Sequence, residues 1–144
     1  MISSNPNLTM EFIDKNITCP WNWYIISEKS NLNMVFVEEH LNKPWNWFII
    51  FSNPNLTMEF IEEYLNKPWN WNVISSNHNL TMEFLEKHPE YSWSWWELSR
   101  NPNITMEFLE KHLECPWYWD EISKHPNLTM KIILIYHGIG IQFH

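Results

Sequence analysis

The sequence contains little glycine, little cysteine and little positive charge. Its only glycines are Gly138 and Gly140, so it has no glycine-rich loop to hold a phosphate group. Nine Lys and Arg residues stand against 17 Asp and Glu residues, and the net charge of -8 disfavours nucleic-acid and anionic membrane partners. No stretch approaches the roughly 20 apolar residues of a membrane span, and the first residues lack a signal-peptide pattern. We therefore expect a soluble chain that is not secreted and has neither a nucleic-acid nor a membrane partner.

The sequence repeats with a period of 24 residues. Asn-Pro-Asn occurs at Asn5, Asn53 and Asn101, with variants at Lys29, Asn77 and His125. A Trp-x-Trp motif follows in the first five repeats, at Trp21/Trp23, Trp45/Trp47, Trp69/Trp71, Trp93/Trp95 and Trp117/Trp119. A fixed period of this length is typical of repeat arrays, in which each repeat contacts only its neighbours. The period predicts a helical repeat array over residues 1–135, with repeats starting at 5, 29, 53, 77, 101 and 125, and an irregular C-terminal tail over 136–144.

Each repeat contains a start signal for a helix. Proline disfavours helical angles in the residue before it, and a Thr or Asn three residues after the proline position is a good N-cap. The predicted caps are Thr9, Asn33, Thr57, Thr81, Thr105 and Thr129. In the third repeat, the spacing of Met58, Ile61 and Leu65 and the pair Phe60/Tyr64 predict a wide apolar face on this helix.

A second, shorter helix is expected around the Trp-x-Trp motif. Pro68 fits the first helical position, and Trp71 to Ile74 is a helical spacing. The alternative is a strand, because Trp-x-Trp also alternates as a strand does and a 24-residue period is compatible with a leucine-rich horseshoe. The preceding proline and the lack of a β-branched run favour the helix. We therefore predict an all-α fold in which a helix alternates with a short α or 3₁₀ helix, and in which the tryptophans stack, offset or edge to face, on those of adjacent repeats.

The periodic polar residues are interpreted as structural. His40, His88 and His112 share one position, but repeats about 10 Å apart are too widely spaced for a tetrahedral metal site. The acidic row Asp14, Glu38, Glu62, Glu86 and Glu110 is interpreted as a solvated helix face, with binding of a cation or a basic partner as the alternative. Asn-x-Thr sequons occur at Asn7, Asn16, Asn55, Asn79, Asn103 and Asn127, and five of the six coincide with the helix entry, so capping explains them without glycosylation.

The sequence predicts no metal site, no cofactor and no enzymatic activity. Cys19 and Cys115 occupy equivalent positions of the first and fifth repeats. Stacking at about 10 Å per repeat would place their thiols roughly 40 Å apart, too far for a disulfide, which favours a reducing, cytoplasmic compartment. No catalytic constellation stands apart from the repeat pattern, and a periodic series of equivalent residues does not provide one.

One position varies strongly between repeats. The residue after the second tryptophan is Tyr24, Phe48, Asn72, Trp96 or Asp120. If it faces outward, Tyr24, Phe48, Phe51 and Trp96 form an aromatic line that would suit a protein partner; the alternative is partly buried packing between turns. The apolar sequence from Ile132 onward no longer follows the repeat pattern. It is interpreted as either a cap on the last repeat or a truncated remnant, and an exposed apolar tail predicts self-association.

The unit NPNLTMEFIEEYLNKPWNWNVISS resembles the tryptophan-rich NPN repeats of giant double-stranded DNA viruses of the mimivirus group. It is more distantly similar to the leucine-rich repeat variant family. The second resemblance implies a right-handed superhelical solenoid, here of about 5.5 repeats. The sequence departs from that family in its tryptophan pairs and in lacking the cysteine cluster that some members use for iron-sulfur binding, so no cofactor carries over. We expect a non-enzymatic scaffold for protein-protein interaction, located in the host cytoplasm if viral. The alternative is a structural or assembly component, associated with a virion, that joins chains end to end.

Overall fold

The computed structural model describes residues 2–126 and residue 128, and every regular element in this part of the chain is a helix. A 3₁₀ helix, η1 (Ile2–Ser4), precedes α1 (Met10–Lys15), α2 (Trp23–Ser27), α3 (Met34–Glu39), α4 (Trp47–Ile50), α5 (Met58–Glu63), α6 (Trp71–Ser75), α7 (Met82–Lys87), α8 (Trp95–Arg100), α9 (Met106–Lys111) and α10 (Trp119–Ile122). The absence of strands among these residues confirms the all-helical prediction and excludes the horseshoe there. Thr129, the segment from Ile132 and the predicted tail at 136–144 lie outside the described residues.

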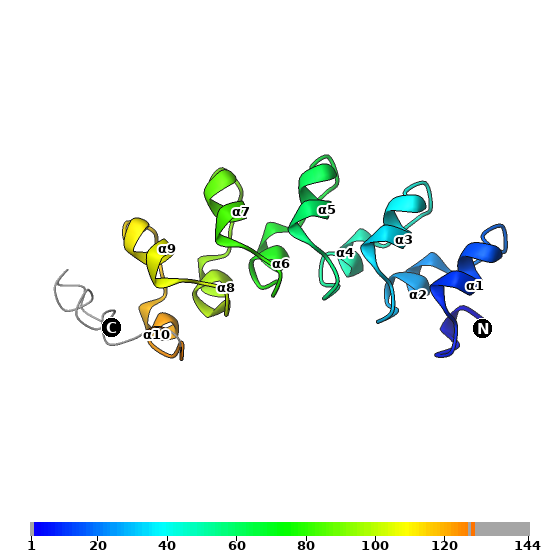
Figure 1. Ribbon diagram of the computed structural model, residues 1–144, viewed down its shortest axis with the longest axis horizontal. Coiled ribbons are helices and arrows are strands. Elements are labelled where there is room, and N and C mark those ends of the chain that lie inside the picture. The colour runs from blue at the N-terminus through cyan, green and yellow to red at the C-terminus, as the bar shows by residue number, and fades with distance from the viewer. Residues whose placement is uncertain (1, 127, 129–144) are drawn as a thin grey trace. The chain divides into compact units, whose positions relative to one another are not determined.

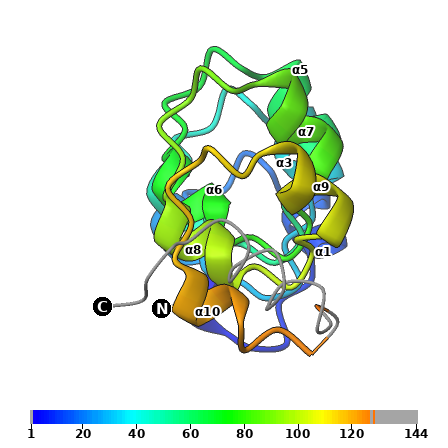
Figure 2. The same cartoon turned by 90° about the vertical axis from the view of Figure 1, so that its left-hand side faces the viewer.

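The chain divides into two compact units, Met1–Asn70 and Trp71–His144. In the first unit, α1, α3 and α5 lie along one side and α2 and α4 along the other (Figure 1). In the second unit, α7 and α9 lie on one side, and α6, α8 and α10 lie on the other (Figures 1 and 2). Contacts join α2 to α4 and η1 in the first unit, and α8 to α6 and α10 in the second. Each unit therefore has two rows of short helices.

The odd-numbered helices begin where the sequence places their caps. The side-chain oxygen of the residue before each helix accepts the backbone N–H three residues later, which is the N-cap hydrogen bond. The donor–acceptor pairs are Phe12/Thr9, Phe36/Asn33, Phe60/Thr57, Phe84/Thr81 and Phe108/Thr105, at 2.9 to 3.3 Å. Glu11, Glu59, Glu83 and Glu107 lie in the first turns, where negative charge interacts favourably with the helix dipole.

These helices are shorter than the apolar pattern predicts. Helix α5 ends at Glu63, and Tyr64 is its C-cap with φ -116°. Leu65 therefore lies outside the helix and is exposed, so its predicted place on the apolar face is wrong. The helix ends early because the carbonyl of Tyr64 accepts two other hydrogen bonds, from the Lys67 N–H at 3.0 Å and from the Trp69 indole at 2.8 Å.

The even-numbered helices begin later than predicted. The expectation that Pro68 occupies the first helical position is wrong, because α6 starts at Trp71. The N–H of Trp69 donates instead to the carbonyl of Lys67 at 2.8 Å, so Pro68 is the central residue of a three-residue turn. The fixed φ of proline, about -65°, suits that position as well as it suits a helix start.

The residue between the two tryptophans caps the short helices. The side chains of Asn22, Asn46 and Ser94 accept the N–H groups of Ile25, Ile49 and Glu97, respectively. Tyr118, the equivalent residue before α10, makes no such bond. The central residue of Trp-x-Trp therefore has a separate role from the indoles on either side of it.

The core lies between the two helix rows of each unit. Its fully buried side chains are aliphatic and recur at equivalent positions, among them Ile13, Val37 and Ile61, then Ile26, Ile50, Ile74, Leu98 and Ile122, then Leu32, Leu56 and Leu80. Among the described residues, no helix combines the length and the apolar character needed to traverse a bilayer.

Candidate functional site

The tryptophans link successive repeats within each unit. The second indole of one repeat packs edge to face against the first indole of the next, a geometry that aromatic quadrupoles favour. The ring centroids are 4.9 Å apart for Trp23/Trp45, 6.1 Å for Trp47/Trp69, 5.3 Å for Trp71/Trp93 and 5.0 Å for Trp95/Trp117. The predicted stacking is present in these four pairs. Trp21 packs instead against Phe12 of its own repeat, with centroids 6.3 Å apart.

The first indole of each repeat is also held by a hydrogen bond. Its N–H donates to the backbone carbonyl five residues earlier, at the end of the preceding odd-numbered helix. The pairs are Trp21/Asn16, Trp45/His40, Trp69/Tyr64, Trp93/His88 and Trp117/His112, at 2.8 to 2.9 Å. All five of these indoles are buried. They are therefore fixed in the fold and are not available as binding residues.

The Asn-Pro-Asn motif binds the preceding repeat. The side-chain amide of its third residue donates to backbone carbonyls one repeat earlier, from Asn55 to Leu32 at 2.9 Å and from Asn103 to Leu80 at 2.8 Å. The first residue of the motif acts similarly, since Asn101 donates to the carbonyl of Asn77 at 3.0 Å. These bonds give the recurring sequons a structural use, as the sequence interpretation holds.

Variants of the motif keep a hydrogen-bond donor at its first position. The Lys29 ammonium donates to the carbonyl of Asn5 at 2.8 Å, and the His125 Nε2 lies 2.8 Å from the carbonyl of Ser99. Three different side chains therefore supply a donor at this position. Those of Lys29 and Asn101 reach the preceding repeat, and that of His125 reaches Ser99 near the end of the fourth repeat.

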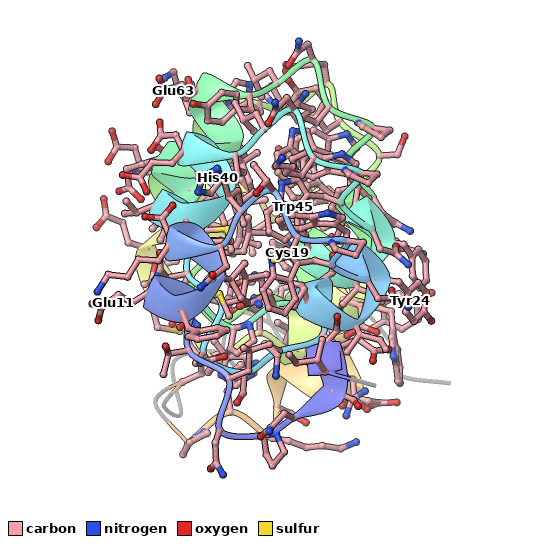
Figure 3. All side chains as sticks on the ribbon, turned by 90° about the vertical axis from the view of Figure 1, so that its right-hand side faces the viewer. Glu11, Cys19, Tyr24, His40, Trp45 and Glu63 are labelled. Carbon is pink, nitrogen blue, oxygen red and sulfur yellow. The ribbon has the colours of Figure 1, made fainter. Side chains whose placement is uncertain are left out.

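Three of the four predicted aromatic residues are exposed at the protein surface. Tyr24 on α2 is 56% exposed, Phe48 on α4 is 67% exposed, and Trp96 on α8 is 41% exposed. In the first unit, Tyr24 lies on the side opposite Glu11 and Glu63, with Trp45 between them (Figure 3). Tyr24 and these two carboxylates of the first unit therefore face different ways.

Phe51 does not belong to this surface. It is 4% exposed, and its ring centroid lies 5.1 Å from that of Trp69. Its prediction as a partner-binding residue is wrong. The reason is its position: the equivalent residues Ser27, Ser75 and Ser99 are all fully buried.

Sequence reasoning missed an aromatic residue in the second unit. Tyr118 is 49% exposed, and its ring meets that of Trp96 edge to face at 5.1 Å. The guanidinium of Arg100 lies 5.6 Å from the centroid of the Trp96 ring, within cation-π range. The sequence feature that could have identified Tyr118 is a tyrosine at the position where Asn22, Asn46 or Ser94 caps a helix in other repeats. Trp96, Tyr118 and Arg100 form one amphipathic surface patch.

The acidic row takes part in contacts between repeats. The carboxylate of Asp14 lies 2.8 Å from the His40 Nε2, and Glu38 accepts a hydrogen bond from the Tyr64 hydroxyl at 2.8 Å. That hydrogen bond, with smaller contributions from desolvation and the nearby negative charge, raises the pKa of Tyr64 to about 12. Asp14 and Glu38 are exposed, as predicted for a solvated helix face, and each also contacts the next repeat.

The end of α9 carries a group of potential metal ligands that sequence reasoning also missed. Donor atoms of His112, Glu114 and Cys115 all lie within 4.8 Å of one another. Burial and, to a smaller extent, the charge of Glu114 raise the pKa of the Cys115 thiol. Repeats spaced about 10 Å apart would place their histidines too far apart to share a metal ion, whereas the three residues of this group lie within one turn of one repeat. The spacing His-x-Glu-Cys was its sequence signal.

Comparisons with models of known families, with curated proteins and with solved structures found no match. The resemblance to viral NPN repeats therefore stays a prediction.

Proposed function

We propose that this chain is a non-enzymatic helical-repeat scaffold that binds a protein partner through its exposed aromatic residues. In this proposal the repeats form a right-handed solenoid of about 5.5 units, and the position after the second tryptophan is the variable binding position. The hydrogen bonds and indole pairs between successive repeats support an array of this kind.

The exposure of large aromatic rings on short helices is the observation that carries the proposal. Tyr24 and Phe48 lie at equivalent positions of the two even-numbered helices α2 and α4. The core contacts of these helices are made by the buried Ile26 and Ile50. Exposed aromatic residues lower solubility without contributing to a core, and aromatic anchors dominate the energetics of protein interfaces. Trp96 with Tyr118 gives the second unit a comparable patch.

The test is a pull-down from host extract with quantitative mass spectrometry, comparing the natural chain with Phe48→Ala and Trp96→Ala. We expect the same partner to be depleted at least tenfold in one or both variants, because truncating an interface hot spot costs about 2 kcal/mol or more. Val35→Ala is the matched control, since Val35 is 62% exposed on α3, in the other helix row of the first unit. Circular dichroism checks that all variants stay helical. An equal loss of captured partners in the control, or a loss of helicity that tracks the loss of binding, argues against the proposal.

A second candidate function is end-to-end assembly, and one observation favours it. Phe12 is 48% exposed, whereas its equivalents Phe36, Phe60, Phe84 and Phe108 are 5 to 6% exposed. The phenylalanine at this position is therefore buried in four repeats and exposed only in the first of the five. A second copy that supplied the missing surface would join chains end to end, as in a structural component of a particle. Light scattering across a concentration series tests this: Phe12→Ser reduces association if the idea is right, and a natural chain that stays monomeric at the highest concentration excludes it.

A further inference from the structure

We propose that the turn after α9 binds a zinc-class divalent cation through His112, Glu114 and Cys115. The site is separate from the aromatic surface and does not depend on the proposed function. Its ligands come from the end of one helix and the four-residue turn that follows it.

The distances in this turn are close to those of a metal site. The Nδ1 of His112 lies 3.7 Å from the Glu114 Oε1, and the Cys115 Sγ lies 4.0 Å from the same oxygen. Tetrahedral zinc, with bonds of about 2.0 to 2.3 Å, holds its donor atoms about 3.5 Å apart. Small side-chain rotations therefore suffice to close the group around an ion.

The donor set also suits this class of metal. Thiolate, imidazole and carboxylate are the three side-chain ligands that zinc uses in proteins. The thiolate disfavours magnesium and calcium, which prefer oxygen ligands alone. Three protein ligands leave the fourth position for water.

The surroundings of His112 orient its ring for metal binding through Nδ1. Its Nε2 is buried without a hydrogen-bond partner, and the nearest carboxylate oxygen, on Glu86, is 3.8 Å away. An Nε2–H facing that carboxylate leaves Nδ1 unprotonated and directed at Glu114. Metal-binding histidines commonly hydrogen-bond a carboxylate through their second nitrogen, and the Glu86 carboxylate, 3.8 Å from Nε2, lies close to that place but outside hydrogen-bond distance. The Lys111 Nζ also lies 3.9 Å from the Glu86 Oε1, so this carboxylate faces both the imidazole and an ammonium group.

Other repeats have the same turn without the complete ligand set, and they provide controls inside the chain. The first repeat has Cys19, but Asn16 and Thr18 replace the histidine and the glutamate. The fourth repeat has His88 and Glu90 with Nδ1 and Oε1 3.3 Å apart, but Tyr91 replaces the cysteine. Only the fifth repeat combines all three ligands among the described turns.

The test uses the intact, reduced chain and two readouts. Titration with Co²⁺ is expected to give thiolate-to-metal charge-transfer absorption and tetrahedral ligand-field bands, which Zn²⁺ then displaces. In the second readout, saturating Zn²⁺ slows alkylation of Cys115 at least tenfold while Cys19 reacts at an unchanged rate, as measured by peptide mass spectrometry.

Variants separate the proposed site from incidental binding. Cys115→Ser abolishes the charge-transfer band, and His112→Gln and Glu114→Gln each weaken Co²⁺ binding tenfold or more, whereas Cys19→Ser has no effect. Cys115 is only partly buried, so these variants are expected to fold, and circular dichroism verifies it. Equal protection of the two cysteines by Zn²⁺, or an unchanged cobalt spectrum in Cys115→Ser, overturns the proposal. The alkylation result on the natural chain stands as a test even if a variant fails to fold.

Discussion

Each indole pair marks a contact between two successive repeats, called a junction below. Two successive junctions of the first unit differ in the residue that lies beside the indole pair. At the first, the buried Ser27 hydroxyl donates to the carbonyl of Trp23 at 2.7 Å and accepts the N–H of Asn46 at 3.1 Å. At the second, Phe51 occupies the equivalent position and packs against Trp69. The indole pair is 4.9 Å apart at the serine junction and 6.1 Å apart at the phenylalanine junction.

The second unit follows the serine pattern. Ser75 and Ser99 accept the N–H groups of Ser94 and Tyr118, respectively, at 2.9 and 3.0 Å. The indole pairs at these junctions are 5.3 and 5.0 Å apart. A small hydroxyl therefore accompanies close indoles, and a phenyl ring accompanies more widely spaced ones. The indole pair is present at all four junctions, whereas the residue beside it varies.

The largest effect is expected when the indole itself is removed. Trp45→Ala and Trp69→Ala each delete a buried ring and its N–H hydrogen bond, so we expect each to destabilise the fold by about 3 to 5 kcal/mol. Trp69→Ala should be the more damaging, because Phe51 loses its packing partner as well. Midpoints of urea denaturation measure the difference. A smaller loss for Trp69→Ala than for Trp45→Ala would show that the phenylalanine junction does not depend on its indole.

A smaller effect is expected from the serine bridge. Ser27→Ala leaves the N–H of Asn46 without its acceptor. A buried unsatisfied donor costs about 1 to 3 kcal/mol, and because this contact is part-buried we expect a cost of about 1 kcal/mol. Ser52→Ala is the matched control, because the Ser52 hydroxyl is exposed and donates only to the carbonyl of Ile49. We expect the control to change stability by less than about 0.5 kcal/mol, as other exposed substitutions do. Equal midpoints for the two variants would show that the bridge contributes nothing.

The sequence was sufficient for features that depend on local chemistry. The Thr and Asn caps need only one side chain and a nearby N–H group, so their positions could be predicted from spacing. The indole pairs recur with the period, so stacking between neighbours could be predicted without coordinates.

Other features depend on tertiary contacts and could not be predicted in the same way. Proline fits both a helix start and the centre of a tight turn, and the choice at Pro68 follows from the hydrogen bonds of Trp69 and Tyr64. The sequence predicts Phe51 as a surface residue because it is aromatic and close to Phe48, but its position is equivalent to that of the buried Ser27. The group around Cys115 lies within a single turn, and a comparison between repeats passes over it.

The smallest expected effect concerns the contact between Glu38 and Tyr64 in the same unit. The carboxylate favours the neutral phenol, so the pKa of Tyr64 is raised from the ordinary tyrosine value of about 10 to about 12 in the folded chain. A raised pKa contributes stability that is complete below the unfolded value of about 10 and is lost as the pH rises through 12. Spectrophotometric titration at 295 nm follows the ionisation, and Tyr64→Phe identifies the Tyr64 step by its loss. Glu38→Ala should move that step down toward pH 10, because the acceptor and its charge are both removed. If the step stays near pH 12 in Glu38→Ala, the hydrogen bond between these repeats does not control Tyr64.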